Sequence, residues 1–215
     1  DAEVFFGVGE YGKTFRSGDN GASWDNETCF TFKQLNGVTY GSNTFVAVGN
    51  DGRIERSTDN GVSWITSNSS GSQLNGIAFG SSTYVAVGAS GRILTSGNGS
   101  SWTSRTDPIY NNHSNYIRNY WGVAFGNNIF VAVGHSSKII RSNSDGSSWS
   151  LTQNYSCNGN HSCDSYSNTL RGVAFGNSTF EAVGKRGRII SSANKGTSWS
   201  CLIYTSTSPR DATLS

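Results

Sequence analysis

Short apolar runs separated by Gly, Asn and Ser recur along the chain at intervals of roughly 40 residues. The clearest copy is residues 122–149, GVAFGNNIFVAVGHSSKIIRSNSDGSSW. It contains two apolar runs, a run that begins with a basic residue, and a turn that ends in Trp. Short apolar runs bounded by Gly and Asn are typical of β-strands, and no stretch shows a clear amphipathic helical pattern. The pattern therefore predicts an all-β array in which each copy supplies four short antiparallel strands.

The copies divide the 215 residues into five units with no break in composition, so we expect one domain. Four strands in about 40 residues are the size of one propeller blade. We therefore expect a single small β-propeller of five four-stranded blades. The expected blades span about residues 1–34, 35–73, 74–119, 120–168 and 169–215.

The first expected blade lacks its own innermost strand, because Val4–Gly9 matches the second run of the other copies. In propellers a C-terminal segment usually fills such a gap, yet the end of this chain offers only Ala212–Leu214 as a poor substitute. Three explanations stay open: the tail fills the gap imperfectly, the chain is truncated, or a neighbouring molecule donates the strand. An open strand edge favours strand addition, so we expect self-association or filament formation as one mode of interaction.

The turn before each closing Trp carries its own motif. Residues 17–24 and 57–64 are close copies of S-x-D-x-G-x-x-W, and three further copies carry Asn or a displaced Asp. Asp or Asn can accept hydrogen bonds from backbone N–H groups two residues on, Gly supplies a positive φ, and Trp buries a large area. We therefore expect a structural role. The residues of the motif are Asp19, Trp24, Asp59, Trp64, Asn98, Trp102, Asp145, Trp149, Asn194 and Trp199.

This motif resembles the Asp-box, or BNR, repeat of sialidase-like β-propellers, and the resemblance covers nearly the whole chain. It implies a propeller fold with the boxes at the periphery, away from any catalytic group. The resemblance does not extend to hydrolysis, because the chain lacks the F/Y-R-I-P motif of sialidases and its few acids lie mostly in turns. A CxxC zinc spacing is also missing. We expect no catalytic residues, no metal and no cofactor.

A basic residue recurs at the start of the third run of every copy. In a five-bladed ring these residues would form a belt on the face that carries the long inserts. The belt could bind an acidic glycan, a carboxylate or an acidic protein. Alternatively, each long side chain covers apolar surface and keeps its charge in water. The belt residues are Lys13, Arg53, Arg92, Lys138 and Arg188.

The four Cys residues allow three pairings. Cys29 and Cys201 stand at nearly matching points of the first and last copies, which become neighbours if the ring closes. Cys157 and Cys163 flank a short insert. We expect the disulfides Cys29–Cys201 and Cys157–Cys163; the alternative is four free thiols in a cytosolic protein.

Seven N-x-S/T sequons fall in expected turns or inserts, where a bulky glycan can be accommodated. Together with paired cysteines they favour a secreted or cell-surface eukaryotic glycoprotein that carries covalent N-glycans. The sequon residues are Asn26, Asn68, Asn98, Asn112, Asn154, Asn160 and Asn177.

The net charge of +2 is too small for a nucleic-acid-binding face, and no apolar run of about 20 residues could span a membrane. The leading hypothesis is a non-catalytic extracellular structural or interaction module that self-assembles through its incomplete first blade. The second is a glycan-binding lectin with pockets between blades, to which insert aromatics such as Tyr116 and Tyr166 would contribute. A glycosidase-like enzyme is the third and the least supported.

Overall fold

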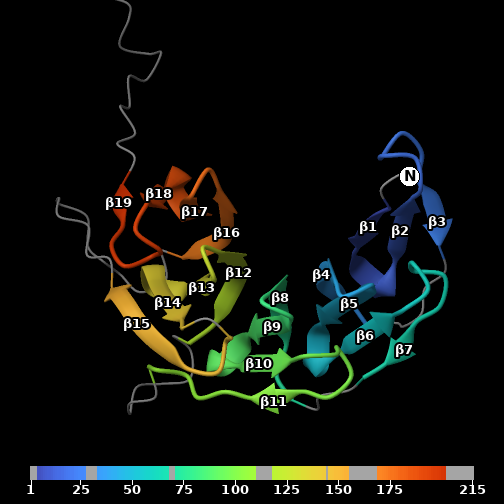
Figure 1. The fold of residues 1–215 in the computed structure, drawn as a ribbon, viewed down its shortest axis with the longest axis horizontal. Helices are drawn as coiled ribbons and strands as arrows, with labels where there is room; N and C mark the ends of the chain where they lie inside the picture. Colours follow the sequence, from blue (N-terminus) through green and yellow to red (C-terminus); the bar gives the residue numbers. More distant parts are fainter. Residues whose placement is uncertain are drawn as a thin grey trace, which may run out of the picture.

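The computed structural model describes residues 4–27, 33–67, 71–109, 118–143, 145–154 and 169–201. These residues form antiparallel sheets, four of them with four strands and the first with three (Figure 1). The prediction of an all-β fold built from four-stranded antiparallel sheets is confirmed. The helical segments within these ranges include single 3-10 turns, and none has the length and apolarity that a membrane crossing requires.

Each sheet is formed by strands that are consecutive in the chain and lie side by side in that order. The strands are β1 (Phe5–Val8), β2 (Thr14–Ser17) and β3 (Asp25–Glu27) in sheet 1; β4 (Leu35–Gly41), β5 (Thr44–Gly49), β6 (Ile54–Ser57) and β7 (Ile65–Thr66) in sheet 2; β8 (Leu74–Gly80), β9 (Thr83–Gly88), β10 (Ile93–Ser96) and β11 (Thr103–Ser104) in sheet 3; β12 (Tyr120–Gly126), β13 (Ile129–Gly134), β14 (Lys138–Ser142) and β15 (Trp149–Asn154) in sheet 4; and β16 (Leu170–Gly176), β17 (Thr179–Gly184), β18 (Ile189–Ser192) and β19 (Ser200–Cys201) in sheet 5.

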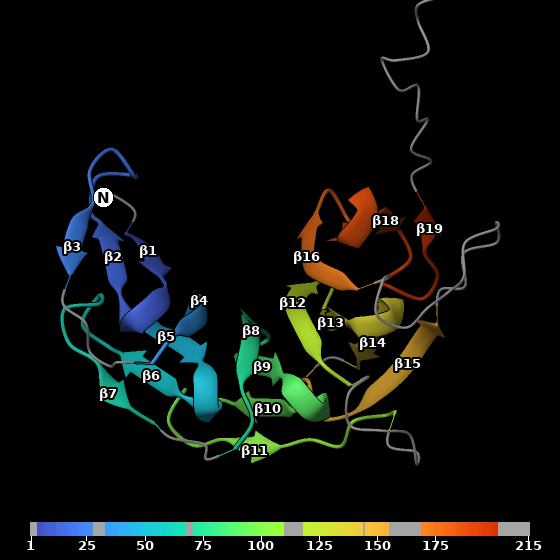
Figure 2. The same ribbon diagram turned by 180° about the vertical axis from the view of Figure 1, so that it is seen from behind.

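The sheets follow one another around an open arc (Figures 1 and 2). The inner strands β4, β8, β12 and β16 lie on its concave side, and β7, β11 and β15 lie on its outer side. Sheets 1 and 5 occupy the two ends of the arc and do not meet in either view. The described residues therefore show the repeat and its curvature, but no closed ring of sheets.

In sheets 2 to 4 the second strand of the repeat reads as a continuous apolar run because both of its faces are covered. In sheet 2, Val46, Ala47 and Val48 are all completely buried. Each core cluster combines two adjacent sheets: Val85 and Ile93 of sheet 3, for example, pack with Phe130 and Ile140 of sheet 4. Burial of this apolar surface stabilises a sheet only when its neighbour is present.

The inner strands approach one another closely at their last glycine. In sheets 2 to 4 a Cβ at this glycine would overlap a phenylalanine ring of the next sheet; the pairs are Gly41 with Phe79, Gly80 with Phe125 and Gly126 with Phe175. Glycine is required there because any side chain would push the ring, and with it the adjacent sheet, outward. The GVAFG run therefore encodes a contact between sheets as well as a strand.

A one-residue bulge interrupts the pairing of each inner strand with its neighbour, between Leu35 and Gly37 in sheet 2 and at equivalent points in sheets 3 to 5. The bulged residue can point toward the next sheet. The Asn36 side-chain amide donates to the Leu74 carbonyl at 2.8 Å, and that of Asn75 donates to the Tyr120 carbonyl at 2.7 Å. These bonds join adjacent sheets near the start of their inner strands.

Two sequons lie in strands rather than in the turns expected for them. Asn26 is part of β3, and Asn154 is the last residue of β15. The outer strand extends further than the sequence pattern indicates, since it faces water on one side and has no apolar run to mark its length. Residues outside the described ranges include the sequons Asn68, Asn112 and Asn160, three of the four cysteines, the insert aromatics Tyr116 and Tyr166, and Ala212–Leu214.

Replacing Gly80 with Ala should lower the free energy of unfolding by about 1–3 kcal/mol, because the new methyl group overlaps the Phe125 ring. The matched control is Gly176→Ala at the same position of sheet 5, where a Cβ meets no atom within 4 Å. The control should stay within about 0.5 kcal/mol of the parent protein. Urea unfolding of the two variants measures this difference, and equal losses would contradict the inter-sheet role of the glycine.

Candidate functional site

Single 3-10 turns join the second and third strands of sheets 2 to 5, and the equivalent strands β1 and β2 of sheet 1. Their middle residue has a φ between +56° and +61°, and the basic residue that follows returns to an extended conformation. The repeats therefore place the five belt residues at equivalent points of five sheets, one to each turn. The turns are η1 (Glu10–Gly12), η2 (Asn50–Gly52), η3 (Ala89–Gly91), η5 (His135–Ser137) and η6 (Lys185–Gly187).

Most belt side chains have partners in the protein. The Arg53 guanidinium pairs with Glu55 at 2.5 Å, Arg92 donates to the Ser72 carbonyl at 2.9 Å, and Arg188 donates to the Ser137 hydroxyl at 2.8 Å. Partial burial lowers the pKa of Arg92 and of Lys138, the latter despite the opposing effect of Asp107. Part of the role of the belt is therefore to tie neighbouring segments together, while its binding of an anion stays a prediction.

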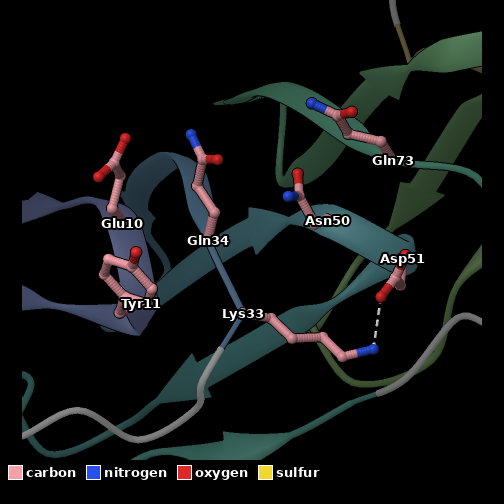
Figure 3. A pocket seen from close by; sticks show the side chains of 7 residues that line it. All are labelled: Glu10, Tyr11, Lys33, Gln34, Asn50, Asp51 and Gln73. Atoms are coloured by element: carbon pink, nitrogen blue, oxygen red, sulfur yellow. Dashed lines mark hydrogen bonds and ion pairs between the residues drawn. The ribbon is translucent and has the colours of Figure 1, made fainter.

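A pocket of about 480 Å³ opens on the face of the 3-10 turns, between sheets 1 and 2 (Figure 3). Its polar groups come from both turns and from the connections that enter the inner strands. Lys33 and Asp51 form an ion pair at 2.5 Å on one side of it. Tyr11 presents a ring that is 66% exposed. The lining residues are Glu10, Tyr11, Lys33, Gln34, Asn50, Asp51 and Gln73.

A second pocket, of about 700 Å³, lies on the same face beside η3. Arg92, Arg105 and Arg118 line it together with Asp107. Asp107 is buried and accepts hydrogen bonds from the Tyr120 hydroxyl at 2.8 Å and from the Ile109 N–H at 3.0 Å. These bonds hold the carboxylate in the wall of the pocket, which the three arginines also line.

The S-x-D-x-G-x-x-W turns are held by their own acidic or amide side chains. The Asp19 carboxylate accepts from the Ser23 N–H and hydroxyl, and Asp59 accepts the same two bonds from Ser63. In these full-length copies the N–H group that donates to the carboxylate lies four residues after the Asp, whereas the sequence motif predicted two. The longer turn brings this N–H group back to the carboxylate. Asn98 bonds the N–H groups two and three residues on in its shorter copy.

The closing Trp fastens this turn in the four later copies. Each indole N–H donates to the carbonyl of the motif glycine at 2.9–3.1 Å. The glycine itself lies against the second strand of the preceding sheet: a Cβ at Gly99 would meet Val46, and one at Gly146 would meet Val85. The motif therefore belongs to the contact between adjacent sheets as well as to its own turn.

The sequence pattern did not reveal a small aromatic and cationic group near the inner strands of sheets 4 and 5. Arg171 lies over the Trp121 ring at 4.0 Å, and His135 lies 5.7 Å from the same ring. Partial burial lowers the pKa of His135, whose Nδ1 is 3.2 Å from the Thr169 hydroxyl. Trp121 and Arg171 occupy equivalent bulge positions of adjacent inner strands. Aligning the repeats in the sequence would therefore have indicated that the two side chains lie close together.

Sheet 1 exposes apolar side chains whose counterparts are buried in the other sheets. Phe5 is 43% exposed and Phe15 is 38% exposed, and the pairing of β1 with β2 places them on one face. Trp24 is 50% exposed, whereas Trp199 is buried. Within the described residues, β1 is also the edge of its sheet.

Cys201 is exposed at the end of β19, and the other cysteines lie outside the described ranges, so both disulfides stay predictions. Among the described residues, no group of three or more His, Cys, Asp and Glu side chains is placed to hold a metal ion.

No known family model and no curated protein matches the chain. Solved structures are similar in fold. YCF48 bound to a D1 peptide gives a TM-score of 0.63 at 16% identity, over 93% of this chain and 63% of its own. The WD40 β-propeller domain of Doa1 gives 0.64 at 16% identity, over 94% and 64%. A nidogen/laminin complex gives 0.62 at 15% identity, over 94% and 78%.

These similarities show that the sheets have the arrangement of a β-propeller. The chain spans less than two thirds of the YCF48 and Doa1 chains. At 15–16% identity the likeness concerns the fold alone.

The carboxylate bonds in the turn motif predict an acid-sensitive stability. Hydrogen bonds from Ser23 and Ser17 lower the pKa of Asp19 from 3.8 to about 2, and those from Ser63 and Ser57 do the same for Asp59. A lowered folded pKa means that the stabilisation is present above the unfolded value of 3.8 and is lost as the pH falls toward 2.

The double variant Asp19→Asn, Asp59→Asn should therefore lose less stability than the parent protein between about pH 4 and pH 2. Asn is a compatible replacement because Asn98 and Asn194 accept equivalent backbone bonds. Urea unfolding at the two pH values measures the effect, and the other carboxylates contribute equally to both proteins. The same pH dependence in both would show that these carboxylates do not titrate near 2.

Proposed function

We propose that this protein is a non-catalytic extracellular interaction module, a β-propeller of five repeats that self-associates through its first sheet. The general role as an interaction or scaffold module is suggested by its β-propeller neighbours, one of which is described as bound to a peptide. The finer proposal rests on the first sheet. The turn motif is assigned to the Asp-box class, with support from the hydrogen bonds that hold its turns.

The exposed face of sheet 1 carries the proposal. Phe45, Tyr84, Phe130 and Phe180 occupy the position equivalent to Phe5, and all of them are buried against a preceding sheet. In sheet 1 this face presents Phe5 and Phe15 to solvent, and Trp24, just before β3, is also exposed. Its edge strand β1 also offers backbone groups that another strand could bond. An apolar face next to an open strand edge is the arrangement that a protein partner can cover.

The extracellular location and N-glycosylation are part of the same proposal. Asn98 and Asn177 are exposed in turns, where a glycan can extend into solvent. Cys201 is exposed at the end of β19, and a disulfide at this position would be of the kind that secreted proteins use.

A glycan-binding function is a second candidate because of the pocket between sheets 1 and 2. Tyr11 offers an exposed ring beside the carboxylate of Glu10 and the amide groups of Gln34 and Asn50 (Figure 3). Carboxylate and amide groups exchange hydrogen bonds with hydroxyl groups, and an aromatic face packs against the apolar face of a sugar ring. The pocket thus combines the two kinds of contact that a neutral glycan needs.

Self-association predicts that the apparent molar mass of the full chain rises with concentration. Phe15→Asp should weaken the association at least about tenfold, because it places a charge on the apolar face. Ile65→Asp is the matched control, since Ile65 is also exposed but lies on the outer strand of sheet 2. Sedimentation equilibrium measures both. A monomer at every concentration, or equal weakening by the two variants, would contradict self-association through sheet 1.

Glycan binding predicts that Tyr11→Ala lowers the affinity for whichever glycan the protein selects from an array by about tenfold. Tyr40→Ala is the control, because Tyr40 is another exposed tyrosine that does not line this pocket. Titration of the selected glycan by calorimetry measures both affinities. Binding that survives Tyr11→Ala would place the glycan elsewhere, and an array without a hit would remove the second candidate.

A further inference from the structure

The contacts between adjacent sheets provide an internal template for one more junction. At each junction the leading face of one sheet meets the trailing face of the next. The leading face presents two residues of the second strand and the first residue of the third, such as Val85, Val87 and Ile93 in sheet 3. In sheets 3 to 5 the trailing face presents an aromatic residue, a small residue and an aliphatic residue, such as Phe130, Ala132 and Ile140 in sheet 4. In sheet 2 the third position is the buried Glu55.

Among the described residues, no neighbouring sheet covers the leading face of sheet 5. Val183 is 48% exposed and Ile189 is 37% exposed. Gly176 also meets no atom within 4 Å, whereas its counterparts in sheets 2 to 4 lie against a phenylalanine ring. The residues equivalent to Val183 and Ile189 in sheets 2 to 4 are completely buried, namely Val48, Val87, Val133, Ile54, Ile93 and Ile139.

The trailing face of sheet 1 is the matching half. Phe5 stands at the aromatic position, Gly7 at the small position and Phe15 at the third position, and the pairing of β1 with β2 places the three on one side. Sheets 1 and 5 lie at the two ends of the arc (Figures 1 and 2). Joining them within one chain would require a change in the curvature at the existing junctions, whereas a second copy brings its own sheet 1 and leaves those junctions as they are.

We infer that the leading face of sheet 5 in one molecule docks on the trailing face of sheet 1 in a second molecule, so that the contact repeats the four junctions inside the chain. This inference rests on the proposed self-association through sheet 1 and names its partner surface. The contact is head-to-tail, so a docked pair keeps one free face of each kind, and the assembly grows until it closes or extends as a filament.

Glu181 sets the strength of this junction. It occupies the position of Phe6, Val46, Val85 and Val131, on which the motif glycine of the next sheet lies. In the docked pair it would meet Gly21 of the second molecule. A carboxylate loses hydration on docking, and such a charge on an exposed sheet face commonly limits unwanted association. Glu181→Val restores the residue of the inner repeats and should therefore tighten the association by about tenfold or more.

The decisive experiment is sedimentation equilibrium of the full chain with one variant for each face. Val183→Asp blocks sheet 5, Phe15→Asp blocks sheet 1, and Ile65→Asp is the control. Each blocked variant should be monomeric at concentrations where the parent and the control associate. An equimolar mixture of the two blocked variants should form a dimer and nothing larger, because the mixture retains a single intact junction between the unblocked faces.

The outcomes separate this inference from the proposed function. If Phe15→Asp abolishes association while Val183→Asp leaves it intact, self-association through sheet 1 stands and the docking on sheet 5 is wrong. A monomeric parent protein overturns both. Circular dichroism checks that each variant is folded, and Val183→Ser and Phe15→Ser replace variants that are not. Weaker or unchanged association of the Glu181→Val protein would also overturn the inference, independently of any loss of stability.

Discussion

Every sheet of this protein depends on an adjacent sheet to cover its apolar faces. In sheets 2 to 4 the second strand is apolar on both sides, so it is buried only when the sheets before and after it are in contact. The closeness of that contact is set by glycine, since the rings of Phe79, Phe125 and Phe175 occupy the space that a side chain would fill. The stability of such an array is approximately the sum of the stabilities of its units and of the contacts between neighbouring units. Each end unit has only one such contact, whereas each interior unit has two.

The functional proposals follow from this constraint. The residues exposed at the ends of the arc occupy positions that are buried in the interior repeats. Most of them are apolar in both places, so the end sheets differ from the interior sheets mainly because they lack a neighbouring sheet. Glu181 is the main departure, because it puts a charge where the interior repeats have an apolar residue. The contact between the end sheets of two molecules is therefore expected to be weaker than the contacts between adjacent sheets inside the chain. The face that carries the 3-10 turns takes no part in this contact and stays accessible to a separate ligand.

Polar groups on the two edges of the sheets have different tasks. On the face of the 3-10 turns, Arg92 and Arg188 bond residues outside their own turns, and partial burial lowers the pKa of Arg92 and Lys138. These contacts show why a recurring basic position need not be a binding site. At the opposite edge, Asp19 and Asp59 each accept several hydrogen bonds within one turn, and in the turn of Asp59 this holds Gly61 against Phe6 of the preceding sheet.

The sequence by itself determined the all-β class, the four-stranded unit and the position of the turn motif, because strand periodicity and turn chemistry are local properties of each repeat. It also indicated that the first sheet lacks a strand, since Val4–Gly9 matches the second run of the other copies. Only the tertiary structure decided the open arc, the strand positions of Asn26 and Asn154, the bulge contacts of Asn36 and Asn75, and the exposed faces at the two ends. These features depend on how one sheet approaches the next. That approach is fixed by contacts between residues about 40 positions apart, which a local pattern does not specify.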